Sequence, residues 1–307
     1  MKAVRIHQFG GPDQLVYEDA PMPTPAAGEV CIRVHAVGVN PYDVKIRQGS
    51  VEKELPHQLP LILGWDVAGD VAALGEGVTS FQVGDPVYVM ANPANDGAYA
   101  EYIVVDAAVI AAKPERLTYP EAASIPLAAQ TALQAIYDLG QLQAGQTILI
   151  HGGAGSVGSF AVQLAKAKGA TVYATAASTD QDYLKQLGAD KTIDYKTQKF
   201  EDIVSDIDVV LDPLGGEVQQ KSWQVMKPGG ILVSTVQPPQ PPSGLQGKLI
   251  NTQSRADTLR TISALVEAGQ LKTLVQKVLP LQEAKQAHDL LEGGLKTPGK
   301  VVLEVAS

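Results

Sequence analysis

Three glycines near the middle of the chain have the spacing of a dinucleotide-binding loop. They match the pattern G-x-G-x-x-G, directly after an apolar run (146–150) and directly before an amphipathic stretch (156–169). In such a loop the first glycine permits a tight turn, the second lets the backbone approach a pyrophosphate, and the third lets helix and strand pack closely. We therefore predict a dinucleotide site at the helix N-terminus, rather than a Gly-rich turn without a ligand. The predicted contacts are Gly153, Ala154, Gly155, Ser156, Val157 and Gly158.

The end of the next apolar run indicates which dinucleotide is bound. An NAD enzyme usually places Asp or Glu there to hold the ribose diol, but residues 171–176 are followed by Ala177, Ser178 and Thr179. These small residues leave room for a 2′-phosphate that Ser178 could contact, which favours NADPH. Asp180 is an unfavourable neighbour for a phosphate, and the other interpretation of Ser178 is an ordinary loop serine.

The elements around this loop alternate between strand and helix. The apolar runs 146–150, 171–176, 207–212 and 231–236 are separated by helical stretches, an order that builds a parallel sheet covered on both faces. Residues 1–110 instead contain short Val- and Ile-rich runs separated by Gly, Pro and Asp, which is typical of β-structure. The predicted fold class is therefore α/β, with a β-rich domain and a doubly wound parallel-sheet domain.

The last apolar run indicates that the parallel-sheet domain is an insertion. Residues 300–305, KVVLEV, need a pairing partner, and we expect them to return to the N-terminal β-rich domain. The predicted domains are residues 1–120 with 270–307, and residues 121–269.

Composition excludes several classes of partner. The formal net charge is −9 and no run of Lys or Arg opposes it, so we expect neither nucleic acid nor a membrane surface as a partner. No apolar stretch reaches the roughly 20 residues that a membrane helix requires. The first ten residues lack the apolar core of a signal peptide, which favours a cytoplasmic location.

The cysteine and histidine content argues against a metal site. Cys31 is the only cysteine, which excludes an internal disulfide and a Cys-rich zinc lobe. None of the five histidines has a metal-ligand spacing. His151, directly before the glycines, is interpreted as a loop residue near the pyrophosphate rather than as a base.

Five ordered segments resemble the medium-chain dehydrogenase/reductase superfamily, and together they cover nearly the whole chain. They are HAVGVNPYDVKIRQG, LPLILGWDVAGDVAALG, FQVGDPVYV, LAAQTALQAIYDLGQLQAGQTILIHGGAGSVG and LLEGGLKTPGKVVLEV. The zinc alcohol dehydrogenases of this superfamily hold their catalytic metal with a Cys after a Gly-Val pair and with the His of a Gly-His-Glu triplet. Asn40 and Trp65 stand at those positions here, and neither is a usual zinc ligand. The resemblance implies GroES-like and Rossmann domains without a metal.

Within the superfamily, the chain is similar to the quinone oxidoreductase branch and most of all to its alkenal/enone reductases. The runs 40–45 and 64–69 carry this similarity. It implies hydride transfer from NADPH to a small electrophile, either a quinone or the β-carbon of an α,β-unsaturated carbonyl. It also implies a homodimer formed by edge strands around 230–249. An NADPH-binding structural or interaction protein with little turnover is the alternative, and a zinc alcohol dehydrogenase with unusual ligands is a third hypothesis.

The resemblance assigns catalytic roles to four residues. Asn40 is expected beside the nicotinamide and the substrate. Lys45 is expected to donate to a carbonyl or enolate oxygen, the alternative being a solvated helix lysine. Tyr42 and Trp65 are expected to line an apolar pocket for a flat substrate, with core packing as the other explanation for Trp65.

The resemblance also assigns cofactor contacts outside the glycine loop. Thr131 matches a family threonine at the nicotinamide carboxamide, or is a small packing residue of a helix. Tyr195 matches a tyrosine near the adenosine ribose phosphate, and Lys300 matches a lysine close to the cofactor. We add Ser234, in the strand-like run after residue 230, to the predicted contacts. Gln181 replaces a lysine that many relatives have for the 2′-phosphate, which weakens the case for NADPH.

Overall fold

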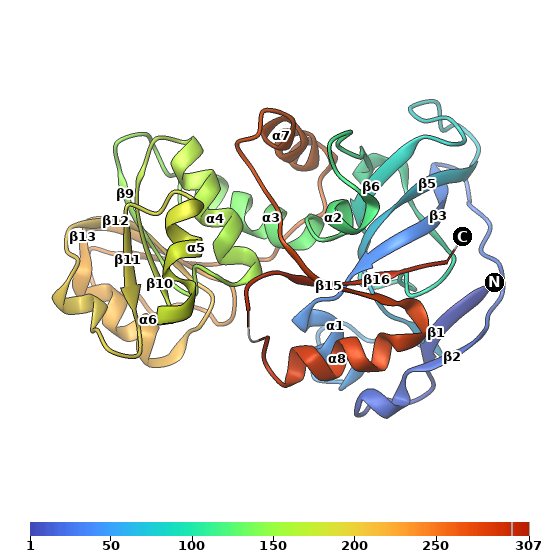
Figure 1. Cartoon of the computed structure of the whole chain (residues 1–307), viewed down its shortest axis with the longest axis horizontal. Coiled ribbons are helices and arrows are strands. Elements are labelled where there is room, and N and C mark those ends of the chain that lie inside the picture. Colours follow the sequence, from blue (N-terminus) through green and yellow to red (C-terminus); the bar gives the residue numbers. More distant parts are fainter. Residues whose placement is uncertain (296, 307) are drawn as a thin grey trace. The chain divides into compact units, whose positions relative to one another are not determined.

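The chain forms two compact units in its computed structural model, which describes residues 1–295 and 297–306 (Figure 1). The first unit comprises Met1–Leu127, Ser254–Glu267 and Thr273–Ser307. The second comprises Ala128–Gln253 and Ala268–Lys272. The second unit is thus inserted into the chain of the first, and each is described separately below.

Two β-sheets dominate the first unit. The larger has the strand order β15-β16-β3-β5-β6-β8, with β7 also paired to β3, and the smaller has the order β2-β1-β4. The strands are β1 (Lys2–Ile6), β2 (Val16–Asp19), β3 (Glu29–Gly38), β4 (Leu61–Ile62), β5 (Asp66–Leu74), β6 (Pro86–Met90), β7 (Tyr102–Asp106), β8 (Ala111–Ala112), β15 (Val275–Pro280) and β16 (Lys300–Glu304). Their buried Val, Ile and Leu side chains form one continuous core.

Four helices complete the first unit: α1 (Pro41–Arg47), α2 (Tyr119–Ala123), α7 (Ala256–Glu267) and α8 (Ala284–Glu292). The start of α1 is set locally, because Pro41 suits the first helical position and the Asp43 carboxylate accepts a hydrogen bond from the Asn40 backbone amide at 2.7 Å. In α8 the residues Ala284, Ala287 and His288 are buried, so one face of this helix packs on the core.

The C-terminal strand β16 returns to the N-terminal β-structure, as the sequence predicts. It pairs antiparallel with β3, Leu303 opposite Val37 and Glu304 opposite Ala36. The predicted domain boundary at residue 269 differs from the division seen here, because α7 lies in the first unit. The Tyr88 hydroxyl explains this placement by donating to the Leu259 carbonyl at 2.7 Å.

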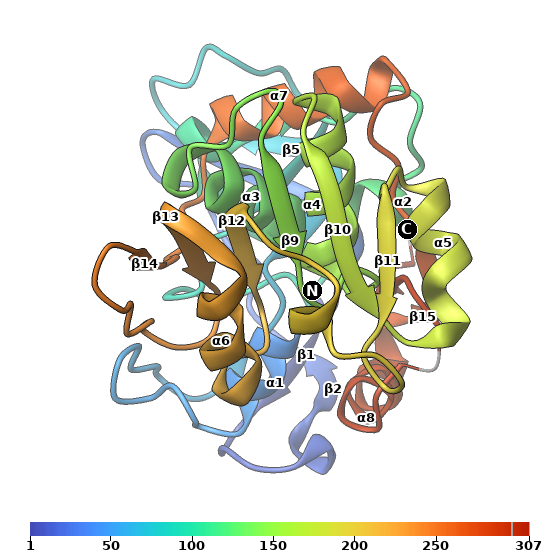
Figure 2. The same ribbon diagram turned by 90° about the vertical axis from the view of Figure 1, so that its left-hand side faces the viewer.

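Six parallel strands form the sheet of the second unit, in the order β11-β10-β9-β12-β13-β14. Figure 2 shows these strands side by side, from β13 through β12, β9 and β10 to β11. Counted from β9 along the chain, this order is 3-2-1-4-5-6, which is the doubly wound dinucleotide-binding order. The predicted α/β fold class is confirmed. The strands are β9 (Thr147–Ile150), β10 (Thr171–Ala176), β11 (Lys191–Asp194), β12 (Ile207–Asp212), β13 (Met226–Ser234) and β14 (Gln246–Leu249).

Helices connect these strands. They are α4 (Ser156–Ala167), α5 (Gln181–Gln186) and α6 (Gly216–Ser222), and α3 (Pro126–Leu133) leads into the unit and continues as a π-helix at Gln134–Leu139. Short 3-10 helices lie at Pro12–Gln14, Ala107–Val109, Ser178–Asp180, Phe200–Asp202, Trp223–Val225 and Leu281–Glu283.

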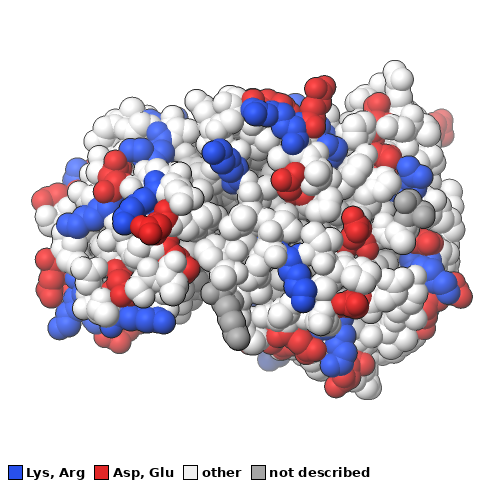
Figure 3. Space-filling view, in the orientation of Figure 1, with Lys and Arg blue, Asp and Glu red and all other residues white. Residues whose placement is uncertain are grey.

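The charged side chains are mixed on the face shown in Figure 3, where Lys and Arg are interspersed with Asp and Glu. Within the described part of the chain, no helix combines the length and the apolar character needed to cross a bilayer.

Candidate functional site

The glycine loop of the second unit is held between three strands. The His151 amide donates to the Leu211 carbonyl of β12 at 3.0 Å, and the Gly153 amide donates to the Thr175 carbonyl of β10 at 2.8 Å. A Cβ atom at Gly158 would overlap the Gly152 carbonyl oxygen and lie 2.7 Å from Gly153 Cα. The start of α4 can therefore approach the loop only because residue 158 is glycine.

The first turn of α4 fits a pyrophosphate. This helix has 12 residues and begins after Gly155, whose extended backbone (φ −74°, ψ 172°) turns the chain into the helix. Amides in the first turn of an α-helix have no partner within the helix, and the helix dipole makes this end attractive to anions.

Exposed apolar side chains surround the loop at the carboxyl edge of the parallel sheet. Tyr195 follows β11, Leu214 follows β12 and Val236 follows β13, and they are 61%, 56% and 46% exposed. Single exposed apolar side chains are ordinary on a protein surface. What distinguishes these three is their place after the carboxyl ends of parallel strands, where ligands bind in such sheets. Of these, the sequence analysis identified only Tyr195. The available signal for Leu214 and Val236 was their place directly after buried parallel strands, where ligands bind in such sheets.

Ser178 and Tyr195 lie at the ends of neighbouring strands. Ala176 of β10 pairs with Asp194 of β11, and the Tyr195 amide donates to the Ala176 carbonyl at 3.3 Å. Ser178 is exposed in the 3-10 turn that follows. The Gln181 amide group folds back and donates to the Ala176 and Ala177 carbonyls, so its role is to shape this turn.

Two further predicted contacts, Ser234 and Thr131, are buried in the second unit. The Ser234 hydroxyl accepts from the backbone amides of Val236 and Gln237 at 3.3 and 3.4 Å, so it shapes the turn that presents Val236. Thr131 Oγ1 lies 2.8 Å from Thr252 Oγ1.

The His151 side chain lies in a buried hydrogen-bond network next to the glycine loop. Thr175 Oγ1 accepts from the Gly152 amide at 3.2 Å, and His151 Nδ1 lies 3.3 Å from the same oxygen. On its other side, His151 Nε2 lies 2.9 Å from Ser222 Oγ. Burial lowers the pKa of His151 to about 4, so the ring is neutral at neutral pH. A buried neutral ring in this network agrees with a loop residue rather than a base.

A buried polar cluster in the first unit brings together Asn40, Asp66 and Lys300. The Asn40 amide group is held at both ends: Nδ2 donates to Asp66 Oδ2 at 2.9 Å, and Oδ1 accepts a short hydrogen bond from Lys300 Nζ. Lys300 Nζ also lies 3.4 Å from Asp66 Oδ2, and these two residues are 4% and 0% exposed. Burial raises the pKa of Asp66, which Lys300 and Asn40 oppose.

Strand topology explains this cluster. β3 ends at Gly38, and its antiparallel neighbours β5 and β16 both begin at that end, so Gly38 pairs with Asp66 on one side and Val302 on the other. A Cβ atom at Gly38 would lie 3.2 Å from both Asp66 Cβ and Lys300 Cε. The absence of a side chain at Gly38 therefore leaves room for Asp66 and Lys300 to reach Asn40. The sequence analysis did not anticipate the role of Asp66.

The other predicted catalytic residues are not members of this cluster. Trp65 is buried, and its indole nitrogen donates to the Asn95 carbonyl at 3.1 Å. Tyr42 is half-buried against the core. Lys45 is exposed on α1, and among the described residues it forms no hydrogen bond or ion pair with the cluster. No group of three or more His, Cys, Asp or Glu side chains in the described ranges is arranged to hold a metal ion.

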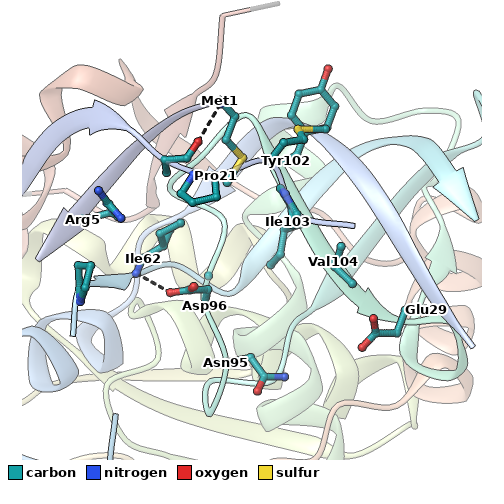
Figure 4. A pocket seen from close by; sticks show the side chains of 15 residues that line it. Met1, Arg5, Pro21, Glu29, Ile62, Asn95, Asp96, Tyr102, Ile103 and Val104 are labelled. Atoms are coloured by element: carbon teal, nitrogen blue, oxygen red, sulfur yellow. Dashed lines mark hydrogen bonds between the residues drawn. The ribbon is translucent and has the colours of Figure 1, made fainter. Parts of the chain in front are cut away.

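The first unit also contains a pocket of about 460 Å³ (Figure 4). Its wall includes Met1, Pro21, Ile62, Ile103 and Val104, and Asp96 beside it accepts from the Ile62 amide at 2.9 Å. None of the predicted site residues lines this pocket.

Two family models match the chain. Residues 26–115 match the alcohol dehydrogenase GroES-like domain, and residues 187–303 match the zinc-binding dehydrogenase family. Asn40 and Trp65, at the zinc-ligand positions, fall in the first match rather than the second.

Several oxidoreductases are similar to this chain over almost its whole length. It is 36% identical to 2-methylene-furan-3-one reductase of Solanum lycopersicum and 35% identical to the chloroplastic NADPH-dependent alkenal/one oxidoreductase of Arabidopsis thaliana, covering 99% of this chain and 79% of each relative. It is 31% identical to the quinone oxidoreductase of Sus scrofa, over 99% of this chain and 97% of that protein.

Solved structures of oxidoreductases have the same overall fold as this chain. The quinone oxidoreductase of Coxiella burnetii has a TM-score of 0.91 at 36% identity, covering 100% of this chain and 99% of that one. A cobalt- and zinc-bound alcohol dehydrogenase of Pyrobaculum aerophilum has a TM-score of 0.88 at 30% identity, covering 99% of both chains. With the strand order, the glycine loop and the metal-ligand positions described above, these similarities show that the chain belongs to the zinc-free quinone oxidoreductase and alkenal/enone reductase branch of the medium-chain dehydrogenase/reductase superfamily.

Proposed function

We propose that this protein is an NADPH-dependent, zinc-independent reductase of quinones or of the C=C bond of α,β-unsaturated carbonyls. The observation that carries the proposal is the buried cluster of Asn40, Asp66 and Lys300, which holds an ammonium group against the side chain of Asn40. The names of the relatives support both classes of acceptor.

The residues of the second unit fit NADPH. The first turn of α4 would hold the pyrophosphate, and the glycine at position 158 lets this turn lie against the loop backbone. Ser178 would donate to the 2′-phosphate, and the exposed ring of Tyr195 would lie against the adenosine. Thr131 remains the proposed contact of the carboxamide. NADPH supplies the hydride when it is bound.

Lys300 is the proposed electrostatic group of the first unit. An ammonium has three N–H donors, and here Asn40 and Asp66 accept two of them. We propose that the third is directed to an oxygen of the bound molecules, while Asn40 and Asp66 fix the direction of the ammonium. A cation held there would stabilise negative charge that develops on a carbonyl oxygen during hydride transfer. Lys45 and Tyr42 are proposed to contact the substrate, whereas the buried indole of Trp65 favours packing.

A substrate panel tests the proposed function. With NADPH we expect turnover of a short 2-alkenal, an enone or a quinone, and the same rate after dialysis against a chelator. We expect NADPH to exceed NADH by about tenfold in kcat/KM, because one charge-assisted hydrogen bond to the 2′-phosphate contributes about 1.5 kcal/mol. A pure preparation that binds NADPH tightly but reduces none of the three classes would support the binding-protein alternative instead.

We also propose a homodimer formed through β14. This strand is the last in the order of the six-stranded sheet, and β13 is its one partner strand in the described part of the chain. Leu249 within β14 is 45% exposed. An unpaired strand edge is a natural template for a second copy. We expect the wild type to sediment as a dimer and Leu249→Lys to sediment as a monomer. A wild-type protein that remains monomeric at micromolar concentration contradicts this proposal.

A further inference from the structure

A second row of buried polar side chains lies behind Asn40 in the first unit. The Asp43 Oδ2 atom accepts from the Asn40 amide at 2.7 Å and from the Tyr99 hydroxyl at 3.3 Å. The Tyr99 hydroxyl lies 3.0 Å from His288 Nε2, and Arg47 Nη1 lies 3.0 Å from His288 Nδ1. We call Arg47, His288, Tyr99 and Asp43 the Arg47–Asp43 chain.

Every hydrogen bond in the Arg47–Asp43 chain has one possible direction. Arginine has donors only, so His288 Nδ1 must accept and the ring proton must lie on Nε2. His288 Nε2 therefore donates to the Tyr99 hydroxyl oxygen, and the Tyr99 hydroxyl in turn donates a hydrogen bond to Asp43 Oδ2. Burial and the nearby Arg47 lower the pKa of His288 to about 3, which keeps the ring neutral. Burial also raises the pKa of Tyr99 well above its usual value, which keeps the hydroxyl protonated.

Burying these polar groups costs desolvation free energy, which their mutual hydrogen bonds offset only in part. All four side chains are at most 1% exposed. Arg47 has a carboxylate partner, since Nη2 donates to Glu292 at 2.9 Å, whereas Asp43 forms no ion pair with any residue that the structure describes. Apolar residues of similar volume are often as stabilising as a buried polar network. What the network provides is a fixed geometry, and its last member holds the Asn40 backbone.

We propose that Asp43, Tyr99 and His288 are positioning residues that hold Asn40, and through it Lys300, in the geometry required for hydride transfer. The inference rests on the proposed function, since Asn40 and Lys300 are its catalytic groups. Asn40 is hydrogen-bonded at two places: Asp66 and Lys300 bind its side chain, and Asp43 binds its backbone amide. Because α8 supplies His288 and α1 supplies Asp43 and Arg47, the network also ties these two helices together.

The protonation of Asp43 gives this inference a readout of its own. Burial raises the pKa of Asp43 to about 7, and the hydrogen bonds from Asn40 and Tyr99 oppose that rise. A carboxylate is a stronger hydrogen-bond acceptor than a carboxylic acid, so the hydrogen bond from the Asn40 backbone amide to Asp43 is strongest above this pKa. The ionisable groups that face Asp43 directly or through Tyr99 are Asp66 of β5, Lys300 of β16, Tyr99, His288 of α8 and Arg47 of its own helix.

The test compares Tyr99→Phe with Tyr88→Phe. Both tyrosines are 0% exposed, and each hydroxyl takes part in two hydrogen bonds, but Tyr88 contacts Leu259 and Ser263 of α7 instead of the Arg47–Asp43 chain. We expect similar losses of stability in urea. We expect Tyr99→Phe alone to lower kcat/KM by about tenfold or more at pH 7, because small misplacements of a reacting group are costly. In Tyr99→Phe the acid limb of the pH profile of kcat/KM should also move to higher pH, because the hydrogen bond from Tyr99 that lowers the Asp43 pKa is gone.

Asp43→Asn is the second variant, because an amide oxygen can still accept from Asn40 but does not titrate. We expect it to lose the acid limb near pH 7 and to keep part of the rate. Equal kcat/KM and equal pH midpoints for the two Tyr→Phe variants, or an unchanged acid limb in Asp43→Asn, would overturn the inference. If the wild type itself reduces no acceptor, the proposed function fails instead, so the two failures are distinguishable.

Discussion

Replacing Gly158 by alanine is expected to weaken NADPH binding by about 100-fold. The added Cβ would overlap the Gly152 carbonyl oxygen and lie 2.7 Å from Gly153 Cα, and both are backbone atoms that no rotamer change can move. The start of α4 must retreat from the loop, and overpacking of this kind costs about 1–3 kcal/mol. The same displacement turns the first-turn amides away from the pyrophosphate. Fluorescence titration with NADPH measures the loss directly.

The control for this variant is Gly11→Ala in the first unit. Gly11 has an ordinary φ of −73°, and a Cβ there would meet nothing within 4 Å. We expect this variant to bind NADPH as the wild type does. Circular dichroism and urea unfolding should show that Gly158→Ala is still folded. If the folded Gly158→Ala protein binds NADPH within about twofold of the wild type, the loop is not the pyrophosphate site.

Replacing Lys300 by methionine is expected to abolish measurable turnover and to lower the free energy of unfolding by about 3–5 kcal/mol. Among the described residues the Lys300 ammonium is the cation that pairs with Asp66, which is 0% exposed, so the substitution leaves a buried carboxylate without its ion pair. Asn40 Oδ1 also loses its donor. Urea unfolding and steady-state kinetics at saturating NADPH measure the two effects.

The loss of stability in Lys300→Met should depend on pH, with a defined sign. Burial already raises the Asp66 pKa above 3.8, and removal of Lys300 raises it further. Below pH 3.8 Asp66 is protonated in both the folded and unfolded states, so the ionisation of Asp66 makes no contribution there. Above that pH the unfolded chain releases the proton more readily than the folded chain, so stability falls as pH rises. We expect the variant to lose more stability relative to the wild type at pH 8 than at pH 5.

The double variant Lys300→Met with Asp66→Asn separates the charge from the chemistry. Without a carboxylate to bury, we expect the free energy of unfolding to recover to within about 1 kcal/mol of the wild type, and the pH dependence due to Asp66 to disappear. Turnover should stay absent, because the ammonium is still missing. Recovery of activity together with stability would show that Lys300 serves the fold alone.

The sequence predicted the features that depend on neighbouring residues. The alternation of strands and helices, the glycine loop before α4 and the pairing of residues 300–305 with the N-terminal β-structure all appear in the fold. Each depends on a local signal: side-chain periodicity, turn-forming glycines or an apolar run that needs a partner. The positions of Asn40 and Trp65 likewise identified the missing metal ligands without any structure.

The sequence could not predict which individual side chains from distant parts of the chain contact one another. Lys300 and Asn40 are 260 positions apart, and His288 and Arg47 are 241 apart. Nothing near His288 distinguishes it from an ordinary polar residue on an amphipathic helix. Equally, α7 joins the first unit through Tyr88, and the Ser234 hydroxyl accepts a hydrogen bond from the Val236 backbone amide in the turn after β13.

The sequence by itself determined the fold class, the glycine loop before α4 and the residue types at positions 40 and 65, because periodicity, glycine spacing and residue type are properties of short segments. Only the tertiary structure decided which polar groups meet. β3 ends where β5 and β16 begin, and this register brings Asn40, Asp66 and Lys300 to one point. Which side chains meet there, and which carboxyl groups are buried deeply enough to shift their pKa, depends on the packing of the whole unit rather than on any single segment.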